Sequence, residues 1–186
     1  VKEGQKISQK LLTFAHGGAP RLYWEDLIEI LNDTVPKAFT RSKHTYRLDI
    51  SGFEKQPVNV KVDRSQIVQI LDGILQNGQE AMKSPGHITI RISKATPASI
   101  ERFNIPEQDY IVISIQDEGT GISPDELPKI FDPYYTTKPD ATGLGLSMSF
   151  SIMQRHHGYL KVESKVGKGS TFYLFFPMPV QNGEEL

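Results

Sequence analysis

Apolar residues recur at intervals of three and four along four stretches of the chain, the spacing that places side chains on one side of an α-helix. The clearest stretch follows Asp63 at steps of 3, 4, 3 and 4: Ile67, Ile70, Ile74, Asn77, Ala81. Asp63 with Gln66 three residues later predicts a capping box at the start of this helix. The predicted helices are residues 5–16, 24–39, 63–84 and 143–156.

Shorter segments alternate apolar and polar residues, or concentrate β-branched and aromatic ones, as β-strands do. They are residues 44–50, 58–62, 87–93, 110–115, 159–164 and 170–176. Residues 94–109 are predicted to form a variable surface loop. Residues 117–142 contain Gly, Pro, Asp and Thr throughout and keep no period, which predicts a long loop. Loops of that length in compact domains are usually functional.

Asn77 is the polar exception within the apolar stripe of the helix 63–84. A buried amide without hydrogen-bond partners costs about 1–3 kcal/mol, so this side chain must find some. Two interpretations follow. Asn77 is either a satisfied core residue or an amide that faces a ligand or a metal ion.

Asp117 stands just beyond the apolar strand 110–115, where a carboxylate can project into a pocket. Gly119 and Gly121 let the backbone adopt positive φ and approach a ligand closely. Ordinary turns use the same residue types, so the segment taken alone favours a structural turn.

The long loop becomes a helix at Thr142-Gly143-Leu144-Gly145-Leu146. A glycine-rich helix start offers free N–H groups and the positive end of the helix dipole, which suits a phosphate, although it also serves as a tight helix entry. Within the loop, Phe131 can anchor the segment on the domain. Lys138 can reach a phosphate or remain solvated.

Taken together and in this order, the segments resemble the catalytic domain of sensor histidine kinases and its wider ATPase superfamily. The matching segments are Ile74–Asn77 (N box), Asp117–Gly121 (G1 box), Phe131–Lys138 (F box), Thr142–Leu146 (G2 box) and the hairpin Gly167–Phe172. Residues 11–20 are similar to the exit from the dimerisation helices in one kinase subgroup. The resemblance covers residues 5–178.

The resemblance implies a Bergerat-type α/β sandwich, with a mixed, mostly antiparallel sheet and helices packed on one face. It divides the chain into the end of a dimerisation helix with its linker (1–19), a catalytic ATP-binding domain (20–180) and a tail (181–186). It also implies ATP and Mg²⁺ as cofactors, with the loop 117–142 as a lid over the nucleotide.

The resemblance assigns a role to each candidate residue. Asn77 and Lys138 are the expected catalytic residues, and the amide oxygen of Asn77 is the expected magnesium ligand, since Mg²⁺ prefers oxygen. Asp117 is expected to accept from the adenine amine. The expected nucleotide-binding residues are Asn77, Asp117, Gly119, Gly121, Lys138, Thr142, Gly143, Leu144, Gly145, Leu146 and Ser170.

Three positions depart from the family pattern. Gly73 replaces an Asn that lies near the metal, which removes a ligand and costs the helix about 1 kcal/mol relative to alanine. Gly78 replaces an Ala, and Ala141 replaces a Gly. The leading hypothesis is a protein-histidine kinase domain that donates the γ-phosphoryl group of ATP. Gly73 favours the alternative of a nucleotide-binding regulatory module with weak or no kinase activity. A gyrase-type hydrolytic ATPase would need a Glu at position 73.

Composition argues against several other classes of protein. The chain has 21 basic and 22 acidic residues and a net charge of −1, so it lacks the broad basic field of a nucleic-acid binder. It has no cysteine for a disulfide framework. It contains no apolar run of the roughly 20 residues that span a bilayer. A cytoplasmic location is expected, although the full-length protein can be membrane-attached.

The five histidines precede Gly, Thr, Ile, His and Gly, so none matches the phosphoacceptor motif of His followed by Glu or Asp. They are expected to be surface or packing residues. The missing motif and the start without Met predict an excised fragment. The expected partners are therefore its own dimerisation and phosphoacceptor domain, a response regulator receiver domain, and a second copy in a full-length homodimer.

Overall fold

The computed structural model describes residues 19–54, 56–139 and 141–178. The predicted helix 5–16 and the predicted tail 181–186 lie outside these residues. In chain order the elements are β1 (Tyr23–Asp26), α2 (Leu27–Phe39), β2 (Thr45–Asp49), β3 (Asn59–Val62), α3 (Arg64–Ala81), β4 (His87–Lys94), α4 (Pro97–Phe103), β5 (Tyr110–Asp117), the 3-10 turn η1 (Leu127–Lys129), α5 (Gly145–Arg155), β6 (Tyr159–Lys165) and β7 (Gly169–Pro177).

Five of the strands form a mixed sheet in the order β2-β4-β5-β7-β6. Only β2 and β4 run parallel, and the other neighbours are antiparallel. β1 and β3 form a separate antiparallel pair. The predicted mixed, mostly antiparallel sheet is therefore confirmed, and each predicted strand is present within one or two residues of its expected bounds.

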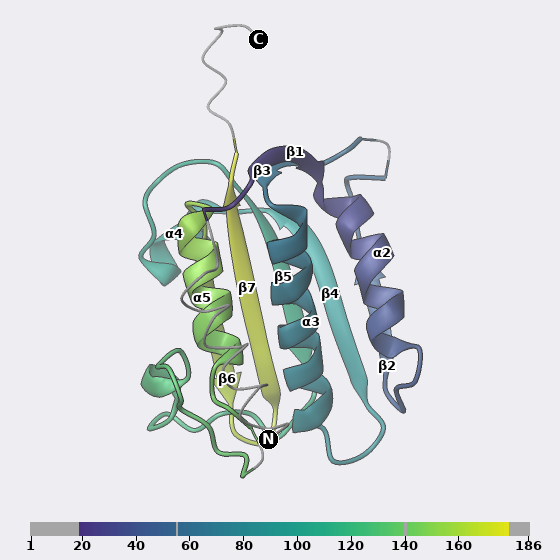
Figure 1. Ribbon diagram of the computed structural model, residues 1–186, viewed down its shortest axis with the longest axis vertical. Coiled ribbons are helices and arrows are strands. Elements are labelled where there is room, and N and C mark those ends of the chain that lie inside the picture. Colours follow the sequence, from purple (N-terminus) through teal and green to yellow (C-terminus); the bar gives the residue numbers. More distant parts are fainter. Residues whose placement is uncertain (1–18, 55, 140, 179–186) are drawn as a thin grey trace, which may run out of the picture.

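The main core lies between one face of the sheet and the helices α2, α3 and α5, which lie across it in Figure 1. Alternate residues of β4, Ile88, Ile90 and Ile92, point into this core and are almost fully buried. Burial of each such side chain contributes about 1.5–3 kcal/mol. Among the described residues, no helix is both long enough and apolar enough to cross a membrane.

The short helix α4 corrects the prediction that residues 94–109 form a loop. Thr96 and Ser99 make a reciprocal capping box at its start, and Asn104 ends it in the left-handed conformation. Its apolar residues Ile100 and Phe103 pack with Tyr110 and Phe175 in a second, smaller core. This cluster is built from the side chains of β5 and β7 that face away from the main core, so α4 covers part of the other face of the sheet.

The strand β1 corrects the predicted start of the helix 24–39. Residues 23–26 pair with β3, with Trp24 opposite Lys61, and α2 begins only at Leu27. Asp26 explains the boundary, because its Oδ1 accepts from the N–H of Ile28 at 3.0 Å and from that of Val58 at 2.9 Å. The carboxylate thus caps α2 and joins it to the segment that leads into β3.

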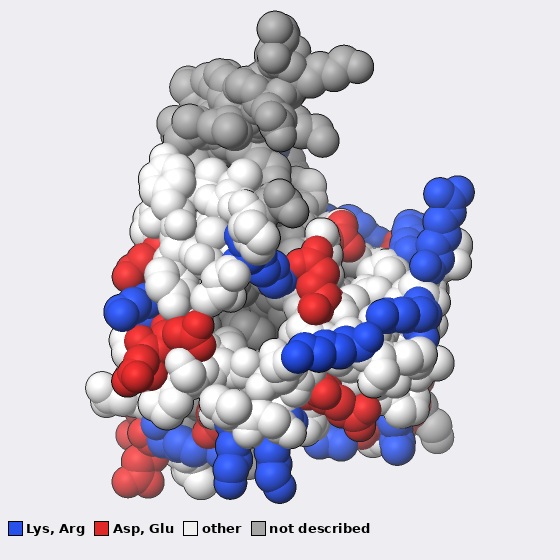
Figure 2. Space-filling model, turned by 90° about the horizontal axis from the view of Figure 1, so that it is seen from below, with Lys and Arg blue, Asp and Glu red and all other residues white. Residues whose placement is uncertain are grey.

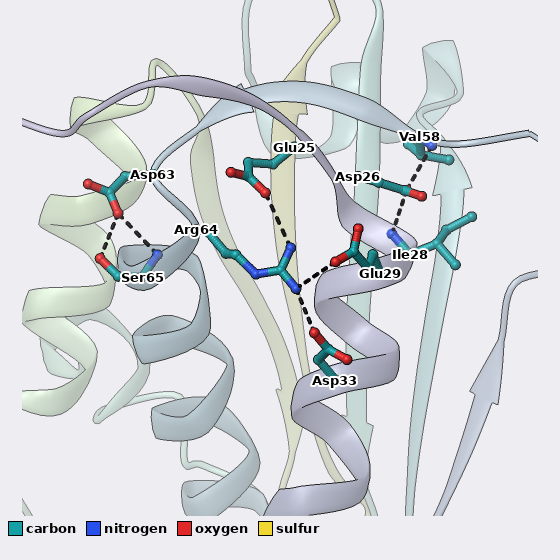
Figure 3. Close-up of polar contacts among 9 residues, drawn as sticks. All are labelled: Glu25, Asp26, Ile28, Glu29, Asp33, Val58, Asp63, Arg64 and Ser65. Atoms are coloured by element: carbon teal, nitrogen blue, oxygen red, sulfur yellow. Dashed lines mark hydrogen bonds and ion pairs between the residues drawn. The ribbon is translucent and has the colours of Figure 1, made fainter.

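Arg64, the first residue of α3, ties three elements together (Figure 3). Its guanidinium contacts Glu25 of β1 at 3.2 Å. It also contacts Glu29 and Asp33 of α2 at 3.1 and 2.6 Å. Each pair is partly exposed and worth at most about 1 kcal/mol, but the shared cation orients α2 against α3.

Asp63 caps α3 as predicted, accepting from the N–H groups of Ser65 and Gln66. The reciprocal half of the predicted capping box is absent, because the Asp63 N–H donates to Nε2 of His156 at 3.0 Å. The Gln66 side-chain oxygen is buried and has no hydrogen-bond partner among the described residues. His156, at the end of α5, therefore holds the start of α3 against α5.

Candidate nucleotide-binding site

The C-terminal ends of β5 and α3, the N-terminus of α5 and the loop 118–142 meet at one end of the molecule, the lower end in Figure 1. Figure 2 views the molecule from this end and shows acidic and basic side chains interspersed over the face. All the predicted site residues belong to these segments or to the adjoining β7, so the fold gathers them at one end.

Asp117 is the last residue of β5, and its side chain is buried although it is charged. Its Oδ1 accepts from the backbone N–H of Gly119 at 2.8 Å and from that of Ser170 at 3.2 Å. Within the described residues, Oδ2 makes no hydrogen bond to the protein. Burial raises the pKa of Asp117, and the two N–H donors oppose that shift. One carboxylate oxygen is thus held by the backbone, and the other is available to a ligand.

The helix α3 passes unusually close to Asp117 at Gly78. A methyl group at this glycine would lie 3.0 Å from Ile88 Cδ1 and 3.3 Å from the Cβ of Asp117. The absent side chain therefore lets the helix backbone approach the end of β5. Asn77 directly precedes Gly78 on α3 and is half-buried.

The turn after Asp117 is fixed on both sides. The N–H of Thr120 donates to the carbonyl of Ala81 at 3.1 Å, and the Thr120 carbonyl accepts from Gly167 at 2.7 Å. Gly121 has a φ of 71°, and a Cβ there would lie 2.2 Å from the carbonyl oxygen of Lys165. Only glycine fits this position, which explains the second glycine of the motif.

The described residues between β5 and α5 form a loop that contains the 3-10 turn η1, in agreement with the loop predicted over 117–142 except that Asp117 ends the strand. Phe131 stacks on Phe150 of α5 with ring centroids 5.2 Å apart, so it anchors the loop as expected. At the far end, Tyr134 donates its N–H to the carbonyl of Gly143 at 2.9 Å. Tyr134 itself has a φ of 68°, which is costly for a residue that is not glycine.

The helix α5 begins at Gly145, two residues later than predicted. Leu144 is its N-cap, and in the described part of the chain no side chain caps the first turn. Gly145 is exposed with open space around it, Thr142 and Gly143 are half-buried, and Leu146 packs against the core. The free N–H groups and the dipole of this helix start favour an anion.

Lys138 extends from the loop to α3. Its ammonium lies 3.5 Å from Oδ1 of Asn77 and forms an ion pair with the carboxylate of Glu80. Gln76 holds the other carboxylate oxygen of Glu80 at 2.8 Å. The sequence prediction brought Asn77 and Lys138 together but missed Glu80. Glu80 is a neighbour of Asn77 on the helix surface, since residues three apart on a helix lie side by side, but a Glu on a partly exposed helix surface does not stand out in the sequence.

Ser170 enters the site through its backbone, since its N–H holds Asp117 while its hydroxyl contacts Ser164 at 3.0 Å. In the described part of the chain, no three His, Cys, Asp or Glu residues form a metal-binding group. An open groove of about 710 Å³ lies on the other side of α3, against the end of α2. It shares Gln76 and Glu80 with the site but includes neither Asn77 nor Asp117.

The histidines fit their predicted packing and surface roles where the structure describes them. His44 is buried and accepts from the N–H of Gly86 at 3.2 Å. His156 is buried between α3 and α5, and His87 and His157 are exposed. His16 lies outside the described residues.

Comparison with known families supplies the deciding observation: residues 62–180 match the profile of the histidine kinase-, DNA gyrase B- and HSP90-like ATPases. The chain belongs to this ATPase family. The match includes Asn77, Asp117, the loop and the start of α5, so the ATP-binding domain of the family is the unit that carries the site.

The relatives of this ATPase domain are named as histidine kinases. It is 41% identical to the sensor kinase CckA of Brucella abortus over 66% of this chain and 13% of that protein. It is 32% identical to the signal transduction histidine-protein kinase AtoS of Escherichia coli over 96% of this chain and 28% of that protein. The chain thus spans less than a third of either relative.

A solved structure shows the same fold. Full-length ShkA, crystallised in complex with AMPPNP, superposes with a TM-score of 0.74 at 22% identity, over 92% of this chain and 35% of that chain. This likeness supports the α/β sandwich architecture of the ATPase domain.

Proposed function

We propose that this chain is the ATP-binding catalytic domain of a two-component sensor histidine kinase, and that it donates the γ-phosphoryl group of ATP to a histidine on a separate dimerisation domain. The observation that carries the proposal is Asp117. It is buried at the strand end and is held by two backbone N–H groups through Oδ1, while Oδ2 accepts no hydrogen bond from the residues that the structure describes. A carboxylate oxygen in that position accepts from the exocyclic amine of adenine, whereas guanine presents a carbonyl there.

The remaining groups fit the phosphates. The start of α5 offers N–H groups that no described side chain caps, and Lys138 supplies a cation from the loop. Phosphoryl transfer depends mainly on positioning and charge stabilisation, which such groups provide.

The donor set also fits Mg²⁺. The Asn77 amide oxygen already accepts a positive group, the Lys138 ammonium, at 3.5 Å, and Mg²⁺ prefers oxygen ligands. Asn77 would hold the ion, and the bound ion would neutralise charge on the phosphates.

Gly73 supports a kinase over a gyrase-type hydrolase, because a glycine cannot act as the general base that activates water. The same residue favours a second candidate, a nucleotide-binding regulatory module with little catalysis, because position 73 supplies no oxygen to a metal. The partners in the leading proposal are the dimerisation and phosphoacceptor domain, a response regulator receiver domain and a second copy in a homodimer. A cytoplasmic location stays a prediction.

Phosphotransfer in trans tests the proposal. The domain is incubated with γ-labelled ATP, Mg²⁺ and the dimerisation domain of a histidine kinase relative. Acid-labile, alkali-stable label on that domain is expected from a kinase, because a phosphorylated histidine hydrolyses in acid. Tight ADP binding without transfer would favour the regulatory module. Absence of adenine nucleotide binding would overturn both.

A further inference from the structure

The cluster where the loop meets α3 contains a carboxylate that the proposed chemistry has not used. Glu80 lies three residues after Asn77, one helical turn further along α3 and on the same side. A single ammonium, that of Lys138, contacts Oδ1 of Asn77 at 3.5 Å and also Oε2 of Glu80. The two oxygens therefore already share one cation.

Glu80 is held in position for this contact. Gln76, one turn earlier on α3, donates to its second oxygen at 2.8 Å. Burial acts to raise the pKa of Glu80, but the bonds from Lys138 and Gln76 outweigh it and lower the pKa, so the group is a carboxylate at neutral pH. The side chains of Glu80 and Lys138 are 42% and 41% exposed, so water reaches the pair.

The exposure decides how firmly the lysine is held. Ion pairs exposed to this degree are weak, so a stronger cation can displace the ammonium. Mg²⁺ is such a cation: it carries two charges, prefers oxygen, and is typically bound through one or two carboxylates together with substrate phosphates and several waters. One turn before Asn77, Gly73 offers no side-chain oxygen, whereas Glu80 offers a carboxylate that already shares the lysine with Asn77.

We propose that Glu80 is the carboxylate partner of Mg²⁺ beside Asn77, and that the Lys138 ammonium occupies this cation position until Mg-nucleotide arrives. The proposal rests on the proposed function, since the metal enters with ATP. Displaced from Glu80 and Asn77, Lys138 is free to move with the loop toward the phosphates. One site thereby exchanges a protein cation for a metal ion.

The test measures ADP affinity by calorimetry in Mg²⁺ and in EDTA, and takes the ratio of the two affinities as the magnesium effect. In Glu80→Gln this effect is expected to fall at least threefold, while affinity in EDTA is unchanged or higher because Lys138 is released. Electron paramagnetic resonance of Mn²⁺ with ADP gives a second readout, and Glu80→Gln should weaken capture of the ion.

Two control variants sharpen the result. Glu101→Gln removes an exposed carboxylate on α4 and should leave the magnesium effect as it is in the wild type. Lys138→Met removes the competing ammonium and should preserve or enlarge the effect, even where it lowers total affinity. Equal magnesium effects in the wild type and Glu80→Gln would overturn the role of Glu80. A wild-type domain that binds no ADP would instead refute the proposed function.

Discussion

Asp117 carries the nucleotide selection in the proposed function, and its two oxygens have different tasks. Asp117→Asn removes the charge while an amide oxygen can still accept from Gly119 and Ser170. A charge-assisted hydrogen bond contributes about 1.5–3 kcal/mol, so ADP affinity measured by calorimetry should fall about tenfold or more. Glu118→Gln, a change at the adjacent exposed carboxylate, is the control. Equal ADP affinity in Asp117→Asn and the wild type would refute the assignment.

Gly73 tests the metal side of the site. A Cβ at this position would lie 3.9 Å from Oγ of Ser149, an ordinary van der Waals contact, so the first side-chain atom fits there. Gly73→Asn should strengthen Mg²⁺-dependent ATP binding, and should stabilise the helix by a few tenths of a kcal/mol because Asn is the better helix former.

The two effects of Gly73→Asn can be distinguished by measuring with and without ligand. Helix propensity acts without nucleotide, whereas metal coordination appears only with Mg-ATP. Melting temperatures measured in both conditions tell them apart. An equal rise with and without Mg-ATP would show that position 73 does not face the metal, and the regulatory-module candidate would lose its main support.

At the scale of single residues, the sequence predicted side chains whose chemistry is unusual for their place. Asn77 interrupts an apolar stripe and Asp117 follows an apolar strand, so both could be identified from spacing. Glu80 could not be singled out in the same way, because a Glu on a partly exposed helix surface is ordinary. Only the position of Lys138, 58 residues later in the chain, reveals its role.

Among the elements, the loop 118–142 is expected to respond most to nucleotide. Among its described residues, η1 is the one regular element. Thr120 and Ile122 hold the start of the loop through hydrogen bonds, and the rest is attached by the Phe131–Phe150 stack, the Tyr134–Gly143 bond and the Lys138 contact. Its amides should exchange with deuterium quickly in the free protein and slowly with ATP, as measured by mass spectrometry. Uniform protection in the free protein would contradict this expectation.

The junction between α3 and α5 should be sensitive to pH through His156. Its Nε2 accepts from the Asp63 N–H, and its Nδ1 lies 2.8 Å from the carbonyl of Ile152, which suits the neutral ring. Burial lowers the pKa of His156 below its ordinary 6.5, an effect opposed by Ile152 and Asp63 and assisted by His157.

The direction follows from proton linkage. As pH falls below about 6.5, the unfolded chain takes up a proton that folded His156 resists, so the free energy of unfolding decreases. Above that pH the contribution is constant. Burial, with some help from Lys43, also lowers the pKa of His44, which adds the same trend. Urea unfolding between pH 7.5 and 5 should show that the free energy of unfolding declines less steeply in His156→Gln than in the wild type. An equal decline in the two proteins would show that His156 does not cause it.

Periodicity predicted which segments are helices and which are strands, except where contacts between distant segments determine the structure. α4 has too few apolar residues to show a helical period, and its packing partners come from β5 and β7. β1 reads as the first turn of a helix until its pairing with β3 is known. Both errors are places where tertiary contacts override the local pattern.

For the molecule as a whole, nucleotide binding should appear as stabilisation. A ligand that binds only the folded state adds about 2.7 kcal/mol at one hundred times its Kd. For a domain of this size that corresponds to a rise in melting temperature of about 5–10 °C. ADP with Mg²⁺ should produce this shift in differential scanning fluorimetry, and GDP should not. Similar shifts with both nucleotides would contradict adenine selection by Asp117.

The helix α4 has a practical consequence for observing the loop in motion. Its inner side is fixed by Ile100 and Phe103 in the second core, while Glu101 faces solvent. The chain contains no cysteine, so introduced thiols are unique labelling points. A dye at Glu101→Cys is a stationary reference on the face of the sheet away from the nucleotide site. A second dye at Thr137→Cys is attached to the loop and moves with it. Fluorescence energy transfer between the two dyes would measure how far the loop moves when nucleotide binds.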